Sequence, residues 1–150
     1  MKRLTILFFV SVALLLSNCN NNDENIQTID SSQPVGELTV LRSGSFTAQN
    51  GTPTAGMAFL GTDEEGTYFL RLGSGFTTEL GTGTVTAFLS TSDTYMADPP
   101  NGNPDLQLIG VVDDNGESFY KLDSAVPAKF THVIIWCASA GIPFGYAPLQ

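Results

Sequence analysis

The stretch Thr131-His132-Val133-Ile134-Ile135-Trp136-Cys137 is followed by Ala138-Ser139-Ala140-Gly141-Ile142-Pro143-Phe144-Gly145-Tyr146-Ala147-Pro148, and it is the most informative part of the sequence. Its first half is apolar and rich in β-branched residues, which predicts a strand that is buried on both faces. This strand ends in the one tryptophan of the chain and in Cys137. The small residues that follow would leave room for another group to approach the thiol, so we look for a chemical centre here.

Further short apolar segments precede this strand, separated by turn-forming residues. Residues 62–66 predict one hairpin turn, and Asp113-Asp114-Asn115-Gly116 predicts another, because Asn-Gly accepts positive φ angles. Long 3.6-residue apolar periods are absent from the part of the chain after the N-terminal leader. This pattern predicts an all-β fold, a single β-sandwich or barrel-like domain. The expected strands are 37–46, 55–60, 67–72, 85–90, 106–112, 117–122 and 131–137.

The length of 150 residues indicates one domain, and the charge excludes some classes of partner. Lys2 and Arg3 belong to the leader described below, so the chain beyond it carries four basic and 15 acidic residues, a net charge of −11. Such an acidic surface makes nucleic acid and anionic lipid surfaces poor partners. The acidic composition does not indicate a particular substrate.

The N-terminus has the features of a bacterial lipoprotein leader. Lys2 and Arg3 form a positive region, and residues 4–16 form an apolar region that is too short to span a membrane. It runs into Leu16-Ser17-Asn18-Cys19, which resembles the lipobox, in which the cysteine is lipidated and becomes the first residue of the mature chain. The alternative is an ordinary secretory peptide with a chance cysteine. We expect Cys19 to be the site of acylation, with palmitate or a similar acyl chain anchoring the protein in the membrane.

The predicted organisation therefore has three parts. Residues 1–18 are the lipoprotein signal peptide, residues 19–36 are the lipidated cysteine and a polar tether that is predicted not to fold, and residues 37–150 are the β domain. We expect the protein in the cell envelope, lipid-anchored in a bacterial outer membrane, with either a periplasmic or a surface-exposed domain.

The residue inventory excludes several kinds of metal site within one chain. After the leader there is one histidine and one cysteine that is not lipidated, so blue copper, iron–sulfur and tetrahedral Cys/His zinc sites lack ligands. Residues 113–117 could hold calcium, although a solvated hairpin tip is the simpler interpretation. Residues 138–141 do not fit a hydrolase nucleophile elbow, because Ile142-Pro143 follows where a helix should begin.

Cys137 has two interpretations. An unpaired cysteine at the end of an apolar strand is usually a small buried hydrophobe, whereas a reactive one does redox chemistry or ligates a metal centre such as haem iron. His132 is not expected to assist, because residues 132, 134 and 136 share one face of a regular strand and residues 133, 135 and 137 share the other. We expect His132 to be a partly exposed edge residue, and Trp136 to be a core residue rather than an electron relay.

The sequence resembles the DM-thirteen, or electron-transfer DM, family over about residues 40–150. The resemblance lies in Val133-Ile134-Ile135-Trp136-Cys137 and Phe144-Gly145-Tyr146-Ala147-Pro148-Leu149, with weaker matches upstream in Leu70-Arg71-Leu72, Phe76, the 85–89 strand, Phe119-Tyr120 and Pro127. It implies a β-rich extracytoplasmic domain with a role in electron transfer or oxidative modification. Cys137 would take the place of the family's redox cysteine, as a bare thiol or as the ligand of a prosthetic group such as haem, with Trp136 beside any cofactor.

The chain departs from that family pattern around the cysteine. A basic residue often follows the family's cysteine, and an aromatic residue often lies three positions after it; here Ala138 and Ala140 occupy those positions. A missing cation would stabilise a thiolate less. The resemblance implies an anchored redox protein that acts through Cys137, with a redox protein as its partner. The alternative is a non-catalytic binding or scaffold module of the cell envelope with a buried structural cysteine.

Overall fold

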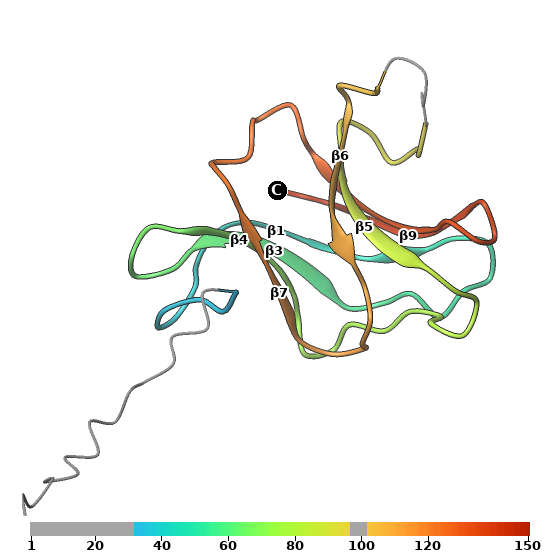
Figure 1. Ribbon diagram of the computed structural model, residues 1–150, viewed down its shortest axis with the longest axis horizontal. Helices are drawn as coiled ribbons and strands as arrows, with labels where there is room; N and C mark the ends of the chain where they lie inside the picture. Colours follow the sequence, from blue (N-terminus) through green and yellow to red (C-terminus); the bar gives the residue numbers. More distant parts are fainter. Residues whose placement is uncertain (1–31, 97–101) are drawn as a thin grey trace, which may run out of the picture.

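The computed structural model describes residues 32–96 and 102–150 (Figure 1). Within these residues every regular element is a β-strand. The predicted leader, the lipidation site Cys19 and most of the predicted tether lie outside the described residues. In the part of the chain that the structure describes, no helix is long and apolar enough to cross a membrane. The strands are β1 (Thr39–Ser45), β2 (Thr47–Ala48), β3 (Met57–Thr62), β4 (Tyr68–Leu72), β5 (Val85–Ser90), β6 (Leu106–Val111), β7 (Ser118–Leu122), β8 (His132–Cys137) and β9 (Ile142–Pro148).

The strands form two antiparallel sheets that pack as a β-sandwich. One sheet has the order β1-β3-β4-β7, and the other has the order β2-β9-β8-β5-β6. The inner faces of the two sheets meet in the core, and the central strands β5 and β8 are largely buried on their outer faces as well. This arrangement confirms the prediction of an all-β sandwich.

The first predicted strand divides between the two sheets at Phe46. Its β1 part pairs with β3, whereas β2 pairs with β9 in the other sheet. Phe46 itself is buried between them and meets Phe76 edge to face, with ring centroids 5.2 Å apart. The carboxyl end of the chain lies beside β1, because Ser43 and Gln150 exchange two backbone hydrogen bonds of 3.0 and 2.9 Å.

The predicted hairpin turn at residues 113–116 is wrong. β6 pairs with β5 in one sheet and β7 pairs with β4 in the other, so the segment between them crosses from sheet to sheet. Residues 113–115 are exposed, and the Asn115 side chain is hydrogen-bonded to the backbone of Thr78: its amide oxygen accepts from Thr78 N at 2.7 Å, and its amide nitrogen donates to Thr78 O at 3.3 Å. The Asn-Gly pair correctly predicted a turn with a positive φ angle, since Gly116 has a φ of 95°. Such a turn does not determine which strands pair.

Among the described residues, the hydrophobic core draws on both sheets, on Phe76, Val112 and Phe130 from the connections, and on Leu149 after the last strand. Both sheets have all their described strands within residues 39–148. Residues 32–150 therefore contain both sheets and this core, and this fragment is the one used in the experiments below.

Candidate functional site

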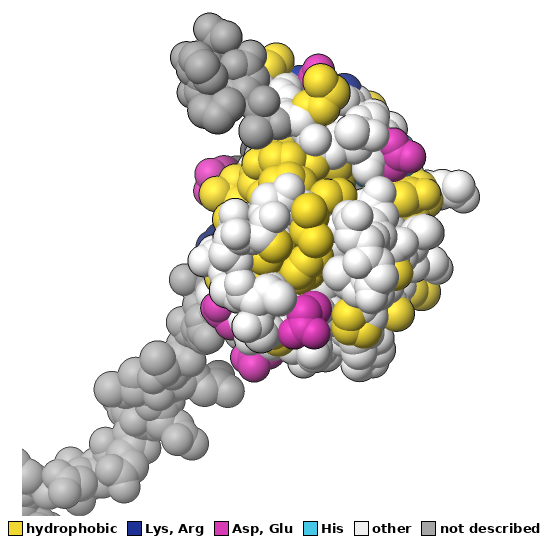
Figure 2. Space-filling view, turned by 90° about the vertical axis from the view of Figure 1, so that its right-hand side faces the viewer, with side chains coloured by type: hydrophobic (Ala, Val, Ile, Leu, Met, Phe, Trp, Pro, Cys, Tyr) yellow, Lys and Arg dark blue, Asp and Glu magenta, His cyan; other side chains and the backbone are white. Residues whose placement is uncertain are grey.

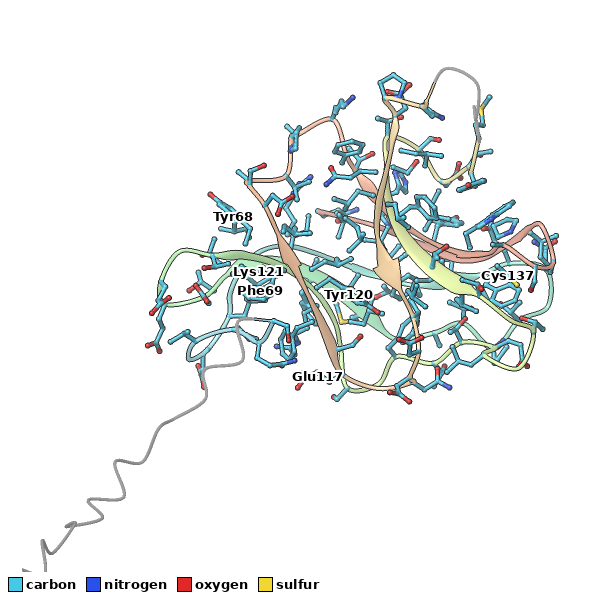
Figure 3. The ribbon with its side chains drawn as sticks, in the orientation of Figure 1. Tyr68, Phe69, Glu117, Tyr120, Lys121 and Cys137 are labelled. Carbon is cyan, nitrogen blue, oxygen red and sulfur yellow. The ribbon has the colours of Figure 1, made fainter. Side chains whose placement is uncertain are left out.

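Cys137 is the last residue of β8, the strand at the centre of its sheet (Figure 3). Val85 lies opposite it on β5, and Ile142 lies opposite it on β9. Its side chain faces the core with those of Val133 and Ile135, and it has no exposed surface. The predicted alternation along this strand is confirmed, and it places the thiol on the inner face of the sheet.

Two hydroxyl groups meet the sulfur. Thr82 Oγ1 and Ser139 Oγ each lie 3.3 Å from Cys137 Sγ, and Ser139 Oγ also donates a hydrogen bond to the Thr82 carbonyl. Either atom of each pair can supply the hydrogen: the neutral thiol can donate to one hydroxyl, whereas the thiolate can only accept from the two hydroxyls.

The loop that carries Thr82 approaches the turn after β8 very closely, and Gly83 makes this approach feasible. Its φ is +116°, and a Cβ atom at this position would lie 2.6 Å from Ser139 Oγ. The β8 turn is itself held by hydrogen bonds from Ala138 N to Thr84 O and from Gly141 N to Cys137 O. The 81–84 loop and the 138–141 turn therefore form one lid over the thiol.

The surroundings of the thiol change its acidity. Burial raises the pKa of Cys137, but hydrogen bonds from the Ser139 and Thr82 side chains and from the backbone N–H groups of Ala140 and Ser139 outweigh this effect. The result is a pKa below the ordinary value of 9.0. Hydroxyl and amide donors therefore stabilise the thiolate, although Ala138 stands where the resembled family often has a basic residue.

His132 and Trp136 lie on the other face of the sheet. His132 is half-buried, and its Nδ1 is 2.9 Å from Thr131 Oγ1, so it is satisfied locally, as predicted, although its strand is central rather than at an edge. Trp136 is not a core residue, which corrects the prediction. Its ring is half-buried and stacks on Tyr95, from the segment that follows β5, with centroids 3.7 Å apart.

The described arrangement does not fit a cysteine-ligated haem. Haem iron would need an open approach to Cys137 Sγ, whereas with the lid closed the sulfur has no exposed surface and both neighbouring hydroxyls lie within 3.3 Å of it. His132, the one histidine in the sequence, is on the opposite face and cannot serve as a second ligand. Trp136 is likewise on the wrong face to line a cofactor held by Cys137. The chemistry available to this site is that of a thiol.

The comparisons with known proteins identify the family. A family model described as Electron transfer DM13 matches residues 45–149. The chain belongs to the DM13 electron-transfer family. No curated protein and no solved structure matches the chain. The DM13 match covers strands β2 to β9 and only the last residue of β1, Ser45, and it includes Thr82, Cys137 and Ser139.

Sequence reasoning found Cys137 but missed its two hydroxyl partners. It did not single out Thr82, and it considered Ser139 only as one of several small residues and within a segment that does not fit a nucleophile elbow. Thr82 is 55 positions away from Cys137, so no local spacing signals their contact. The pairing of β5 with β8 brings them together, and that pairing becomes visible only in the structure.

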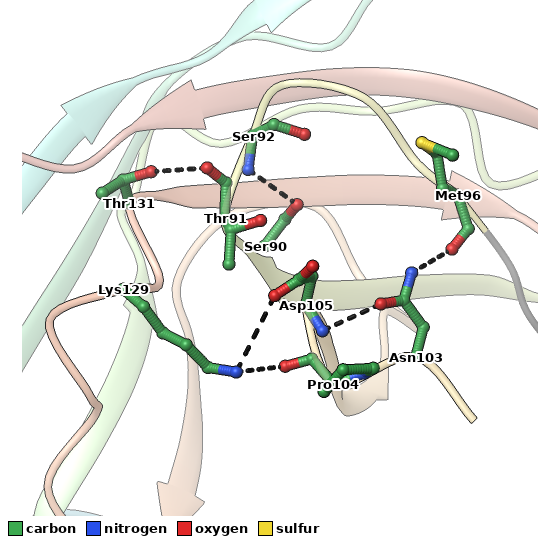
Figure 4. Close-up of polar contacts among 9 residues, drawn as sticks. All are labelled: Ser90, Thr91, Ser92, Met96, Asn103, Pro104, Asp105, Lys129 and Thr131. Carbon is green, nitrogen blue, oxygen red and sulfur yellow. Dashed lines mark hydrogen bonds and ion pairs between the residues drawn. The ribbon is translucent and has the colours of Figure 1, made fainter. Parts of the chain in front are cut away.

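A polar cavity of 370 Å³ lies away from the thiol, between residues 90–94 and 102–106 (Figure 4). Its polar groups bond to one another: Ser90 Oγ accepts from Ser92 N, and Asn103 donates to the Met96 carbonyl. Lys129 Nζ lies 3.8 Å from Asp105 Oδ1 and also donates to the Pro104 carbonyl. These contacts hold the long connection in shape, and we assign no chemistry to them.

The end of the molecule that carries Cys137 also carries apolar surface. Figure 2 looks at the side of the molecule that lies to the right in Figure 1, where Figure 3 labels Cys137. It shows hydrophobic side chains gathered in one patch that is bordered by uncharged polar and acidic groups. Apolar patches of this kind are typical of surfaces that a protein partner covers.

Proposed function

We propose that this DM13 domain does redox chemistry through Cys137, which acts as a bare thiol. The observation that carries this proposal is the cluster of donors around the sulfur, which lowers the pKa of Cys137 in a member of an electron-transfer family. A lower pKa makes the thiolate, which is the reactive form, more abundant near neutral pH.

The chemistry that suits a single thiol is exchange with a disulfide on a partner protein. The Cys137 thiol first loses its proton to solvent, and the thiolate then attacks one sulfur of the partner's disulfide. A bond forms between Cys137 and that sulfur, the partner's own disulfide bond breaks, and the second partner sulfur leaves as a thiolate. Cys137 is oxidised, and the departing partner sulfur takes up the electron pair.

The chain has no second thiol with which to resolve the mixed disulfide. Its other cysteine, Cys19, is proposed to be acylated, so the resolving thiol must come from the partner. The partner is therefore proposed to be a dithiol or disulfide protein, and the apolar patch at the Cys137 end of the domain supports docking of such a protein.

The sulfur has no exposed surface, so this exchange requires the lid to open. The lid is held by few contacts: the Thr82 and Ser139 hydrogen bonds and the Ala138 N to Thr84 O bond. Short loops with few contacts open locally at a small free-energy cost. The reactivity of Cys137 is thus proposed to be gated by the 81–84 loop.

The proposed setting is the cell envelope. Residues 1–18 act as the signal peptide, Cys19 carries the lipid, and the polar residues up to 36 tether the domain to an outer membrane. Support comes from the sequence alone, in the order of positive region, apolar region and cysteine. Acyl chains on Cys19 would place the membrane within reach of the domain and of its redox partner.

The alternative function is a non-catalytic binding or scaffold module. Complete burial of Cys137 within the core cluster favours this alternative, because such a cysteine also packs as a small hydrophobe. The two functions differ in how the native thiol behaves.

Titration of the native thiol in the 32–150 fragment separates the two functions. Cys137 is the one cysteine in this fragment, so a chromogenic disulfide reports on it alone, and Cys137→Ser supplies the blank. We expect labelling of the folded protein at a rate that rises with pH. A visible spectrum of fragment produced with haem available should show no band that Cys137→Ser removes. A thiol that labels only after unfolding would support the scaffold module instead.

A further inference from the structure

An apolar cavity lies at the end of the sandwich where the connection from β7 to β8 crosses between the sheets. Its volume is 170 Å³. Leu60, Tyr68 and Leu122 line it from the sheet, and Val126 lines it from the connection. Pockets that hold drug-sized ligands measure about 300–1,000 Å³, so this cavity has room for a short apolar chain and not for a large ring system.

The rim of the cavity is also apolar because β1 is irregular there. Val40 pairs with Gly61 and Arg42 pairs with Leu60, so Leu41 between them has no partner in the ladder. The bulge turns Leu41 outward, where 56% of its surface is exposed, and its neighbour Val40 is 46% exposed. A chain longer than the cavity could therefore continue over an apolar lip.

One cation lines this otherwise apolar cavity. Arg42 donates to the Phe130 carbonyl at 2.6 Å and to the Val126 carbonyl at 3.5 Å. Among the described residues no carboxylate lies within ion-pair distance of it, whereas Arg71 and Lys129 each have one. The two carbonyl groups hold the Arg42 side chain in place. A guanidinium has five N–H donors, so Arg42 retains donors that these carbonyls do not use, and its positive charge is not compensated by a described carboxylate.

We propose that this cavity binds a medium-chain fatty acid, with its carboxylate on Arg42 and its chain between Leu60, Tyr68 and Leu122. Charge complementarity selects an anionic head group, because a neutral or cationic one would leave the Arg42 charge uncompensated beside apolar surface. The volume and the apolar lip select a flexible chain. This binding site is separate from Cys137 and does not depend on the proposed redox function.

The test is a titration of the isotope-labelled 32–150 fragment with sodium octanoate, followed by NMR, with 1-octanol and octylammonium as chain-matched probes. We expect octanoate to bind saturably, to shift the Arg42 side chain and the amides of residues 122–130, and to bind at least about tenfold more tightly than either other probe.

Three variants locate the site. Arg42→Gln should weaken octanoate binding by about tenfold or more while octanol binding stays the same. Ala125 is exposed and lines the cavity, so the tryptophan side chain of Ala125→Trp would fill the cavity mouth. This variant should abolish octanoate binding without lowering the melting temperature. It replaces Arg42→Gln as the decisive variant if Arg42→Gln does not fold. Arg71→Gln, which removes a cation already paired with Glu117, should leave binding unchanged.

Several results would overturn the assignment. These are equal affinity for octanoate and octanol, shifts that map elsewhere on the domain, or octanoate binding that survives Ala125→Trp. Tighter binding by a short apolar peptide with a free terminal carboxylate would also overturn it, in favour of a protein partner.

Discussion

At the scale of single residues, the acidity of Cys137 depends on two hydroxyl groups. Burial raises the pKa of Cys137 and the Ser139 and Thr82 hydrogen bonds lower it, so Ser139→Ala and Thr82→Val should each raise the pKa of the thiol. The measurement is the ultraviolet absorbance of the thiolate during a pH titration of the 32–150 fragment, which does not depend on access to the sulfur. Ser74→Ala, at an exposed position, is the matched control and should leave the titration unchanged.

The same pKa shift makes stability depend on pH. Because the pKa of Cys137 is lower in the folded protein than its ordinary 9.0, the thiolate is favoured by folding, and this contribution to stability is complete above pH 9.0. The contribution is lost as the pH falls through the folded-state pKa. Chemical unfolding from neutral pH to above 9.0 should therefore show wild type gaining stability relative to Cys137→Ser. A constant difference across this range would show that the pKa is not lowered.

Gly83 should control access to the thiol. Gly83→Ala introduces a Cβ atom that would lie 2.6 Å from Ser139 Oγ, at a φ of +116° that L-residues rarely adopt. We expect a loss of stability of about 1–3 kcal/mol and faster labelling of Cys137 by a chromogenic disulfide, because the loop must move off the turn. Gly75→Ala is the matched control, since a Cβ at that position would meet nothing within 4 Å.

At the scale of elements, the β3–β4 hairpin also holds the incoming chain. Burial raises the pKa of Asp63, but hydrogen bonds from the backbone N–H groups of Val35, Thr67, Glu65 and Gly66 outweigh it, so the pKa lies below 3.8. Asp63→Asn should lower the melting temperature at neutral pH. The difference in melting temperature between the variant and wild type should disappear as the pH falls through the lowered pKa of Asp63, because wild type then loses the hydrogen bonds to its charged carboxylate. Glu65→Gln, an exposed neighbour, should change little.

The connection between β5 and β6 is held to the sheet by an aromatic contact. Tyr95 stacks on Trp136 and meets Phe88 edge to face, with centroids 5.2 Å apart. Tyr95→Ala should lower stability by about 1 kcal/mol and shift the emission of Trp136, the one tryptophan, to the red as water reaches it. Unchanged emission would mean that the contact does not form in solution.

The sequence predicted a strand where the local pattern of residues determines it. It did not predict features that depend on which strands pair with each other. Short apolar runs with β-branched residues located the strands that end at Ser90 and Cys137, because both faces of these strands are largely buried. The last strand, Ile142–Pro148, was missed as a strand, since two prolines and a glycine weaken its signal and its register shifts near Trp136. The Asn115–Gly116 turn chemistry was recognised, but the connection was predicted to be a hairpin, whereas it crosses from one sheet to the other. The contact of Thr82 with Cys137 follows from sheet order, which no local pattern contains.

At the scale of the whole molecule, the proposed anchor predicts where the protein is found. Cys19→Ser should move the protein out of the membrane fraction and abolish its labelling by metabolically supplied palmitate, because without acyl chains the polar tether has little affinity for a bilayer. Cys137→Ser, which removes the other cysteine, should leave membrane retention unchanged. Persistent palmitate labelling of the Cys19→Ser variant would contradict the anchor.

The central claim is that Cys137 cycles between a thiol and a mixed disulfide, and its state in the cell tests this most directly. Cells that express the full-length chain would be quenched with acid, before and after brief exposure to a small disulfide oxidant, and free thiols then alkylated. We predict a partner-linked species in membrane fractions that grows with oxidation, disappears on reduction and is absent from Cys137→Ser. A Cys137 that stays a free thiol throughout would contradict the account.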